Sequence, residues 1–421
     1  MTAVIEQSFA RFLKCRECGK EHPPTKLAVC EDCFAPIDME YDFDSIKLNR
    51  KSFINRPRNI WRYRELLPIE NSRNIVDLGA GCTPLVKCVN LGEHLGLSNL
   101  YIKNDTVNPT YSFKDRPASV AVSKALEFKD RAVGCASTGN LAGAVAAHAG
   151  KAGLQCYVLA PSNTERSKFS QVSAYGGKIL SIDGTYDDAN RLAVLASEEF
   201  GWNIVNVTSR PYYVEGSKTM AFEVAEQLGW KTPDQIIIPV ASGALLCAMH
   251  RGFHQFNKIG LIDDVDVKVN GAQASGCGPV AQAFANRSDS VIPVENPNTI
   301  AKSIAIGDPG DGVYVLQTVR STGGIVGGVS DKEIIEAIKL LARCEGVFSE
   351  PAGGVTVALL KKMVEEGKID KDEITVCCIT GNGLKTGEGV IDASENIIQV
   401  EATLDALTDK VSKWDGLNAS R

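Results

Sequence analysis

From about residue 100 onward, short apolar runs rich in β-branched residues alternate with longer segments whose apolar residues recur every three or four positions. The short runs predict buried strands and the longer segments predict amphipathic helices. The expected strands are Leu100–Lys103, Ala132–Ala136, Cys156–Ala160, Lys178–Ile182, Ile204–Val207, Ile236–Val240, Val265–Asn270 and Thr375–Ile379. The expected helices are Arg116–Lys129, Leu141–Lys151, Asp187–Glu199, Val214–Leu228 and Asp331–Cys344. This alternation predicts an α/β fold with parallel sheets, in which ligands bind beyond the carboxyl ends of the strands.

The region before residue 100 lacks this regular alternation. Residues 46–99 make a transition, in which Asn71–Cys82 is expected to form a strand and Thr83–Leu85 a turn. Residues 1–45 are expected to form a separate unit, because they contain two Cys-x-x-Cys pairs with turn residues between them.

The two cysteine pairs are candidate ligands of a structural zinc ion. Each pair can aim two thiolates at one tetrahedral ion, and four cysteine ligands leave no open position for catalysis. The interval between the pairs is shorter than in the usual zinc template, so an empty ribbon and thiols that pair on oxidation remain alternatives. The four candidate ligands are Cys15, Cys18, Cys30 and Cys33.

Composition narrows the class of protein. The 421 residues are 44% hydrophobic and 23% charged, with a net charge of −6, which is ordinary for a globular protein and gives no electrostatic footprint for nucleic acid. The apolar runs are too short and too interrupted to predict a membrane span. The N-terminus lacks a signal-peptide pattern, so we expect a cytoplasmic protein whose 13 cysteines are mostly free thiols.

The first candidate catalytic residue is Lys114, in the segment Asn108–Pro117. Asp115 and Pro117 mark the start of a helix, so the lysine lies near a helix N-terminus. The positive end of the helix dipole disfavours a protonated ammonium there and favours the free amine that Schiff-base chemistry requires. A solvated surface lysine is the common alternative.

Three further segments follow predicted strands in the way expected of ligand-binding loops. Cys135–Gly143 and Pro239–Leu245 each lead from a strand through small residues into a helix, where backbone N–H groups can approach an anion. An ordinary capped turn between strand and helix is the alternative for each. Thr380, at the start of Thr380–Lys385, is expected to project its hydroxyl from the end of the last strand into the same region.

Together, these motifs resemble those of the threonine synthase family. Ser-Phe-Lys-Asp-Arg, Ser-Thr-Gly-Asn, Glu-Gly-Ser-Lys-Thr and Thr-Gly-Asn-Gly-Leu-Lys occur in the family's order, and the resemblance covers roughly residues 75–400. The cysteine-rich start is similar to that of archaeal-type members. The resemblance implies the tryptophan-synthase-β-like fold and the cofactor pyridoxal 5′-phosphate (PLP). It further implies that O-phospho-L-homoserine and water are converted to L-threonine and phosphate by a homodimer.

The resemblance also implies roles for individual residues. Lys114 is expected to bind the cofactor covalently and to act as a base, and Asn140 to bind its phenolic oxygen. Thr380 is expected to face the pyridine nitrogen, and Ser137 and Thr138 to meet the substrate. The cofactor phosphate is expected to bind the backbone of Ala241, Ser242, Gly243, Ala244 and Leu245.

This chain departs from the family pattern in two places. The family's phosphate loop is often Gly-Asn-Ala-Gly-Asn, whereas Ala241–Leu245 reads Ala-Ser-Gly-Ala-Leu, although backbone donors do not depend on the side chains. Relatives also place a substrate-phosphate arginine two residues before the glutamate that corresponds to Glu215. That place holds Tyr213 here, and we expect the nearest arginine, Arg210, to take over the role.

Two other functions remain open at this stage. Cysteate synthase, which uses phosphoserine and sulfite, resembles threonine synthase closely and has a similar cysteine-rich start. The second alternative is a zinc-ribbon protein that binds nucleic acid or a partner and has an inactive α/β body, which the near balance of charges in the ribbon disfavours. His250 and His254 have a helical metal-binding spacing but lack the glutamate of a metalloprotease motif.

The expected domain organisation has three parts. A zinc-ribbon-like unit spans residues 1–45, and a smaller α/β domain spans residues 125–207. The larger PLP-binding α/β domain is discontinuous and comprises residues 46–124 and 208–421.

Overall fold

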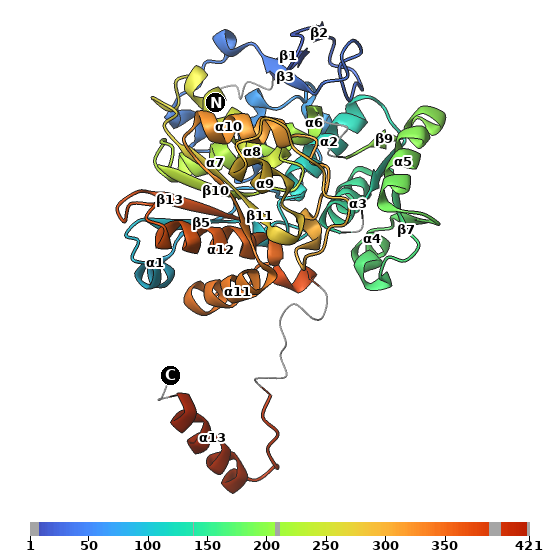
Figure 1. Cartoon of the computed structure of the whole chain (residues 1–421). Helices are drawn as coiled ribbons and strands as arrows, with labels where there is room; N and C mark the ends of the chain where they lie inside the picture. The colour runs from blue at the N-terminus through green and yellow to red at the C-terminus, as the bar shows by residue number, and fades with distance from the viewer. Residues whose placement is uncertain (1–7, 138, 207–210, 387–396, 419–421) are drawn as a thin grey trace. The chain divides into compact units, whose positions relative to one another are not determined.

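Three sheets organise the chain in a computed structural model that describes residues 8–137, 139–206, 211–386 and 397–418 (Figure 1). Residues up to 387 form one unit, and residues 388–421 form a second unit that contains the last helix. The helices span Val89–Leu95 (α1), Asp115–Glu127 (α2), Asn140–Ala152 (α3), Ser170–Ala174 (α4), Tyr186–Phe200 (α5), Pro211–Ser217 (α6), Thr219–Gln227 (α7), Ala244–Lys258 (α8), Pro279–Ala285 (α9), Gly312–Ser321 (α10), Asp331–Glu345 (α11), Pro351–Glu365 (α12) and Leu404–Asn418 (α13).

The N-terminal sheet is small and antiparallel, with strand order β2-β1-β3. Its strands are Ala10–Cys15 (β1), Glu21–His22 (β2) and Ile37–Tyr41 (β3). Buried apolar residues of β1 and β3, such as Leu13 and Met39, belong to the same hydrophobic cluster as the core of α7 and α8. The small sheet is therefore packed on the body of the protein through a continuous core.

The largest sheet has six strands in the order β12-β11-β10-β13-β5-β4. All neighbours are parallel except β4, which runs antiparallel at one edge. Helix α12 packs across β10, β11 and β13. The strands are Leu85–Lys87 (β4), Leu100–Asn104 (β5), Gln235–Pro239 (β10), Lys268–Ala274 (β11), Val326–Val329 (β12) and Thr375–Ile379 (β13).

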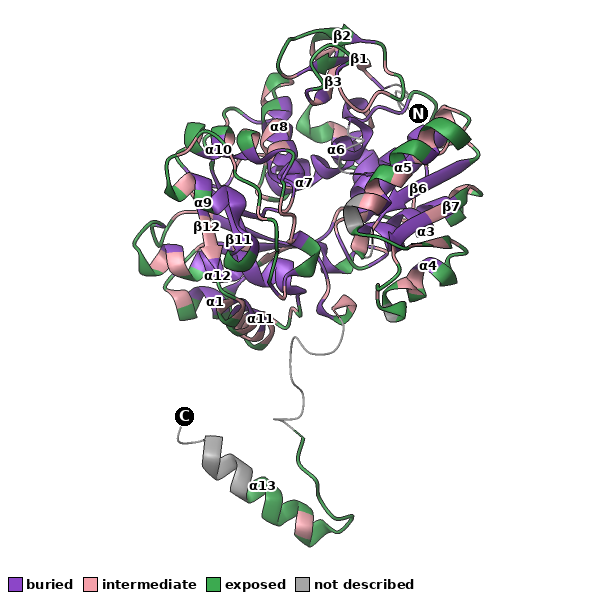
Figure 2. Cartoon of the chain, turned by 45° about the vertical axis from the view of Figure 1, so that its right-hand side comes forward, coloured by how far each residue is buried: buried purple, intermediate pink, exposed green. Residues whose placement is uncertain are grey.

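The third sheet has four parallel strands in the order β8-β7-β6-β9. The strands are Ala132–Ala136 (β6), Gln155–Pro161 (β7), Lys178–Ile182 (β8) and Asn203–Ile204 (β9). Helices α3 and α5 pack against β6 and β7, and Figure 2 shows α3 buried over most of its length. The two parallel sheets confirm the expected α/β fold class. The domain boundaries expected from the sequence stay a prediction.

A buried network of ion pairs joins α2 to elements next to the six-stranded sheet. The guanidinium of Arg116 donates to Asp105 at 2.6 and 2.8 Å and to Glu223 at 2.5 and 2.8 Å. Lys103 approaches Glu223 at 2.6 Å, and these cations lower the pKa of the Glu223 carboxyl to about 2 against the effect of its burial. Because buried charges are costly unless they are paired, the network holds the start of α2 against β5 and α7.

Two expectations about secondary structure are wrong. Asn71–Cys82 forms no strand, because the backbone of Val76 is hydrogen-bonded by the hydroxyls of Ser119 and Ser123 in place of a neighbouring strand. Val214–Leu228 is two helices, α6 and α7, separated at Lys218, and apolar periodicity continues across the break. In addition, the glycine-containing stretch Val326–Val329 forms β12, for which the sequence predicted no strand, and leads into α11.

The second unit is described by its one helix, α13. Leu404, Leu407 and Val411 are exposed on it and recur at intervals of three and four residues. Among the described residues, none of the helices has the length and apolar character to cross a membrane.

Candidate active site

The segment before Lys114 is attached to the carboxyl end of strand β13. Ser112 forms a bridge with Gly381, and the Phe113 N–H donates to the carbonyl of Thr380 at 2.9 Å. Lys114 is the N-cap residue of α2, and its carbonyl accepts the first helical bond, from Ala118, at 3.0 Å. Lys114 therefore lies at a helix N-terminus, as expected, and the structure also places the segment before it beside the end of β13.

The amine of Lys114 is half-buried and faces aromatic side chains. Its Nζ is hydrogen-bonded to the hydroxyl of Tyr213 and lies 4.5 Å from the ring centroid of Phe113 and 5.2 Å from that of Tyr213. Aromatic walls of this kind exclude water while their faces tolerate a cation. Tyr213 stands at the place where the family pattern has an arginine, and nothing in its residue type indicated this contact.

Asn140 is the first residue of α3, directly after the loop that follows β6. Its Nδ2 donates to both carboxyl oxygens of Glu350, at 3.0 and 2.9 Å. Glu350 is the N-cap residue of α12, and its burial raises the pKa of the carboxyl, while Asn140, Lys385 and Lys114 oppose that rise. Glu350 is thus hydrogen-bonded to Asn140 and interacts electrostatically with Lys114, the two residues expected to bind the cofactor.

Sequence reasoning missed Glu350, although a signal was available. Pro351 directly follows it, and proline at the first position of a helix is common, so Glu350 could be recognised as a helix-cap residue. Its carboxyl also explains why the last motif has a glycine at position 381, because a Cβ on Gly381 would lie 2.2 Å from Glu350 Oε1.

Thr380 and Lys385 complete the region after β13. Thr380 is buried directly beyond the strand end. The amine of Lys385 donates to the carbonyl of Thr110 and to Oε1 of Gln171, both at 2.7 Å. Burial lowers the pKa of the Lys385 amine, and Glu350 and Asp115 oppose this.

The loop Ala241–Leu245 joins β10 to α8, as expected. Gly243, the N-cap residue of α8, has φ +94°, and a Cβ there would lie 2.6 Å from Val315 and 2.8 Å from Asp311. The N–H of Asp311 donates to the carbonyl of Ser242 at 2.9 Å. The turn therefore requires glycine, and it leads into the first-turn amides of a helix, which favour an anion.

Two expected substrate residues, Thr138 and Arg210, lie outside the described residues. Ser137 follows β6 directly, and its hydroxyl accepts the N–H of Gly139 at 3.3 Å. The loop residue Ser137 thus stands next to the helix that presents Asn140.

The four cysteines of the N-terminal sheet converge. Their Sγ atoms all lie within 4.8 Å of one another, with Cys15 and Cys33 at 3.4 Å and Cys18 and Cys30 at 3.7 Å. Four thiolates around one tetrahedral zinc ion lie about 3.8 Å apart. The arrangement therefore fits a structural zinc site.

Most of the chain is similar to proteins of known family. Residues 76–381 match the family model of pyridoxal-phosphate dependent enzymes. The threonine synthase of Methanocaldococcus jannaschii is 40% identical over 94% of this chain and 98% of the relative, and that of Methanosarcina acetivorans is 40% identical over 95% and 98%. The chain belongs to the threonine synthase family of PLP-dependent enzymes.

Solved structures of related enzymes share the fold. The processed form of threonine deaminase isoform 2 from Solanum lycopersicum matches with a TM-score of 0.62 and 25% identity, over 75% of this chain and 81% of that one. Maize serine racemase matches with a TM-score of 0.61 and 23% identity, over 80% and 93%. The second likeness supports the fold alone.

The residues present fit the cofactor of this family. Lys114 offers a half-buried amine, and the side chains of Asn140 and Thr380 lie on the elements that border it. The glycine turn at Gly243 presents the first amides of α8 just beyond the end of β10, the strand next to β13. An amine, an amide, a hydroxyl and an anion-binding helix start are the groups that an aldehyde-bearing, phosphorylated pyridine requires.

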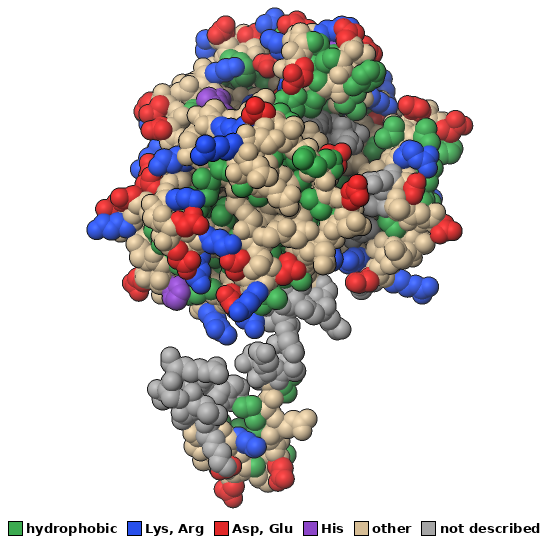
Figure 3. Space-filling model, viewed as in Figure 1, with side chains coloured by type: hydrophobic (Ala, Val, Ile, Leu, Met, Phe, Trp, Pro, Cys, Tyr) green, Lys and Arg blue, Asp and Glu red, His purple; other side chains and the backbone are tan. Residues whose placement is uncertain are grey.

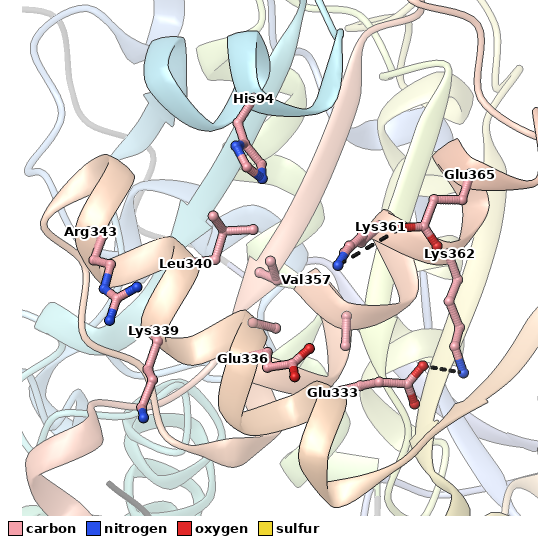
Figure 4. Close-up of a pocket in the computed structure, with 12 residues that line it drawn as sticks. His94, Glu333, Glu336, Lys339, Leu340, Arg343, Val357, Lys361, Lys362 and Glu365 are labelled. Atoms are coloured by element: carbon pink, nitrogen blue, oxygen red, sulfur yellow. Dashed lines mark ion pairs between the residues drawn. The ribbon is translucent and has the colours of Figure 1, made fainter. Parts of the chain in front are cut away.

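A separate pocket of about 270 Å³ lies among α1, α11 and α12 and shares no residue with the candidate site (Figure 4). Its charged side chains are of both signs, and Glu333 pairs with Lys362 at 2.9 Å. On the face of the molecule seen in Figure 3, basic and acidic side chains are likewise interspersed. This pocket adds no group to the chemistry of Lys114.

Proposed function

We propose that this protein is a threonine synthase that converts O-phospho-L-homoserine and water to L-threonine and phosphate. The observation that carries the proposal is the Lys114 amine at the start of α2, facing Tyr213 and within the field of Glu350, in a chain 40% identical to threonine synthases over nearly their whole length. We further propose a cytoplasmic homodimer.

In this proposal Lys114 binds the cofactor and moves protons. Bound PLP supplies an electron sink for negative charge that develops on the substrate carbons. The amine of Lys114, once exchanged for that of the substrate, accepts a proton from the substrate α-carbon and returns a proton in the closing steps.

The other roles are assigned as the motifs imply. Asn140 donates to the phenolic oxygen of the cofactor, and the hydroxyl of Thr380 faces the ring nitrogen, to which it offers a hydrogen bond but no acidic proton. Backbone N–H groups of Ala241–Leu245 hold the cofactor phosphate. The substrate is bound by Ser137, Thr138 and Arg210.

Zinc is assigned to Cys15, Cys18, Cys30 and Cys33 as a structural ion. The support is the convergence of the four sulfur atoms. With no open coordination position, the ion stabilises the N-terminal sheet and takes no part in turnover.

The test of the function is a substrate comparison. Purified protein supplied with PLP is expected to release phosphate from O-phospho-L-homoserine with equal formation of L-threonine, and Lys114→Ala should abolish both products. Preferential turnover of phosphoserine with sulfite would identify a cysteate synthase and contradict the proposal.

A further inference from the structure

Tyr213 is the residue of the site that the family pattern does not explain. It is 2% exposed and belongs to α6, two residues before Glu215. Its hydroxyl is hydrogen-bonded to Nζ of Lys114, and its ring centroid lies 5.2 Å from the same atom. A neutral phenol therefore occupies the position expected for a phosphate-binding arginine and contacts the reactive amine.

The contact is built into the packing of α6 on α2. Gly216 lies so close to the start of α2 that a Cβ would be 2.2 Å from the carbonyl oxygen of Arg116. Glu215 is held by Arg251 at 2.6 Å and by the hydroxyl of Tyr41. Because the residues that follow Tyr213 are fixed on both sides, the phenol has little freedom to leave Lys114.

Among the described residues, Phe113 and Tyr213 contact the Lys114 amine and the charge of Glu350 acts on it, and these three groups differ in what they can do. The Phe113 ring can neither donate nor accept a conventional hydrogen bond, and the Glu350 carboxylate can only accept. The Tyr213 hydroxyl can donate to a neutral amine and can accept from an ammonium. We propose that Tyr213 is a positioning residue that holds the Lys114 amine in both of its protonation states.

The proton count in this role is simple. When Nζ is neutral, the phenol O–H donates to its lone pair. When Nζ has taken a proton from the substrate α-carbon, the ammonium N–H donates to the phenol oxygen. The proton that Lys114 takes up is the proton that it later returns, and tyrosine keeps its own throughout. Because the bond from the ammonium is charge-assisted, it is the stronger of the two.

The test compares Tyr213→Phe with Tyr212→Phe. Tyr212 is the neighbouring buried tyrosine, and its hydroxyl donates to the carbonyl of Thr25 at 2.8 Å, so the control also loses one buried hydrogen bond. The first readout is the rate at which cofactor-free protein captures PLP, followed by absorbance across a pH series. It needs no substrate, so it stands apart from the proposed function.

We expect the pH profile of capture by Tyr213→Phe to move about 0.5–1 pH unit lower, because the ammonium loses a charge-assisted bond. The Tyr212→Phe profile should coincide with wild type. The second readout rests on the proposed function: kcat for phosphohomoserine should fall about tenfold with KM nearly unchanged, as for an interaction that acts during proton transfer.

An isosteric variant covers the case in which phenylalanine disturbs the fold. A fluorinated tyrosine at position 213 keeps the hydroxyl but accepts a hydrogen bond less well, so its profile should move in the same direction. Capture profiles that coincide for wild type, Tyr213→Phe and the fluorinated variant would overturn the proposal. So would an equal shift in Tyr212→Phe. A shifted capture profile without turnover of phosphohomoserine would support the role of Tyr213 and reject the substrate.

Discussion

The surroundings of single side chains decide the chemistry of this protein. Lys114, Asn140 and Thr380 could be named from the sequence because each belongs to a short motif directly after a predicted strand. The sequence around Glu350 shows only that it caps a helix, and the contacts of Glu350 with Asn140 and of Tyr213 with Lys114 could not be predicted, because they join residues far apart in the chain. Motifs reveal local geometry, whereas long-range partners depend on how helices pack.

Replacing Arg210 tests whether this residue binds the substrate phosphate. Its guanidinium can give two parallel hydrogen bonds to phosphate, so Arg210→Ala removes a charge-assisted contact. We expect kcat/KM for phosphohomoserine to fall about ten- to a hundredfold, as for a loss of about 1.5–3 kcal/mol. PLP affinity should be unchanged, and Arg131→Ala, at an exposed arginine, serves as the control. Wild-type kinetics for Arg210→Ala would reject the assignment.

His148 gives a pH dependence of stability that is independent of activity. Burial in α3 lowers the pKa of its ring from 6.5 to about 4, so the ring is neutral at pH 7 and forms no ion pair with Asp115 at 3.8 Å. Because the unfolded chain binds this proton at higher pH than the folded one, stability is lost as the pH falls from 6.5 towards 4.

In a denaturant titration, His148→Gln should reduce the stability difference between pH 7.5 and pH 4.5 by about 2–3 kcal/mol. The matched control is His94→Gln, because His94 is an exposed histidine on α1. An unchanged difference in His148→Gln would show that the buried ring is not responsible.

At the scale of elements, partly buried ion pairs connect the N-terminal sheet to the rest of the enzyme. Arg16, next to the candidate zinc ligand Cys15, pairs with Asp38 at 2.7 Å and with Asp311 at 3.0 Å. Asp311 also donates its N–H to Ser242 in the loop assigned to the cofactor phosphate. The sheet therefore supports the site from outside without supplying a group to it.

Cys15→Ser combined with Cys18→Ser tests this supporting role. We expect the variant to lose bound zinc and to melt roughly 5–10 °C lower, while retaining measurable turnover, because a closed metal site stabilises folding only. Cys344→Ser, outside the cluster, should retain zinc and stability. The absence of zinc from reduced, chelator-free wild-type protein would reject the metal assignment.

Element prediction succeeded where the pattern was local and failed where packing decided the outcome. Strands β6, β8 and β13 have the bounds expected from their apolar runs. Strand β12 was missed because its two glycines weaken the strand signal, yet packing demands one of them: a Cβ on Gly327 would lie 2.3 Å from Leu359 in α12.

At the scale of the whole molecule, helices that follow strands of the four-stranded sheet are hydrogen-bonded at the candidate site to residues that border the six-stranded sheet. Asn140 on α3 is hydrogen-bonded to Glu350 at the start of α12, and Gln171 on α4 is hydrogen-bonded to Lys385 after β13. Ligands of α/β proteins bind where strand ends converge, and these pairs join such ends. The fold class and this convergence followed from the order of strands and helices, whereas the pairs themselves required the three-dimensional structure.

The central claim is that Lys114 is the lysine that binds PLP, and the covalent bond itself provides the most direct test. The protein loaded with PLP is reduced with borohydride, digested and analysed by mass spectrometry. Lys218 is buried and Lys385 is half-buried, and burial lowers the pKa of each amine, that of Lys218 to about 8, so both are competitors for the cofactor. We predict that the reduced cofactor is found on the peptide that contains Lys114 and is lost in Lys114→Ala. Label on Lys218, Lys385 or any other lysine would contradict the account.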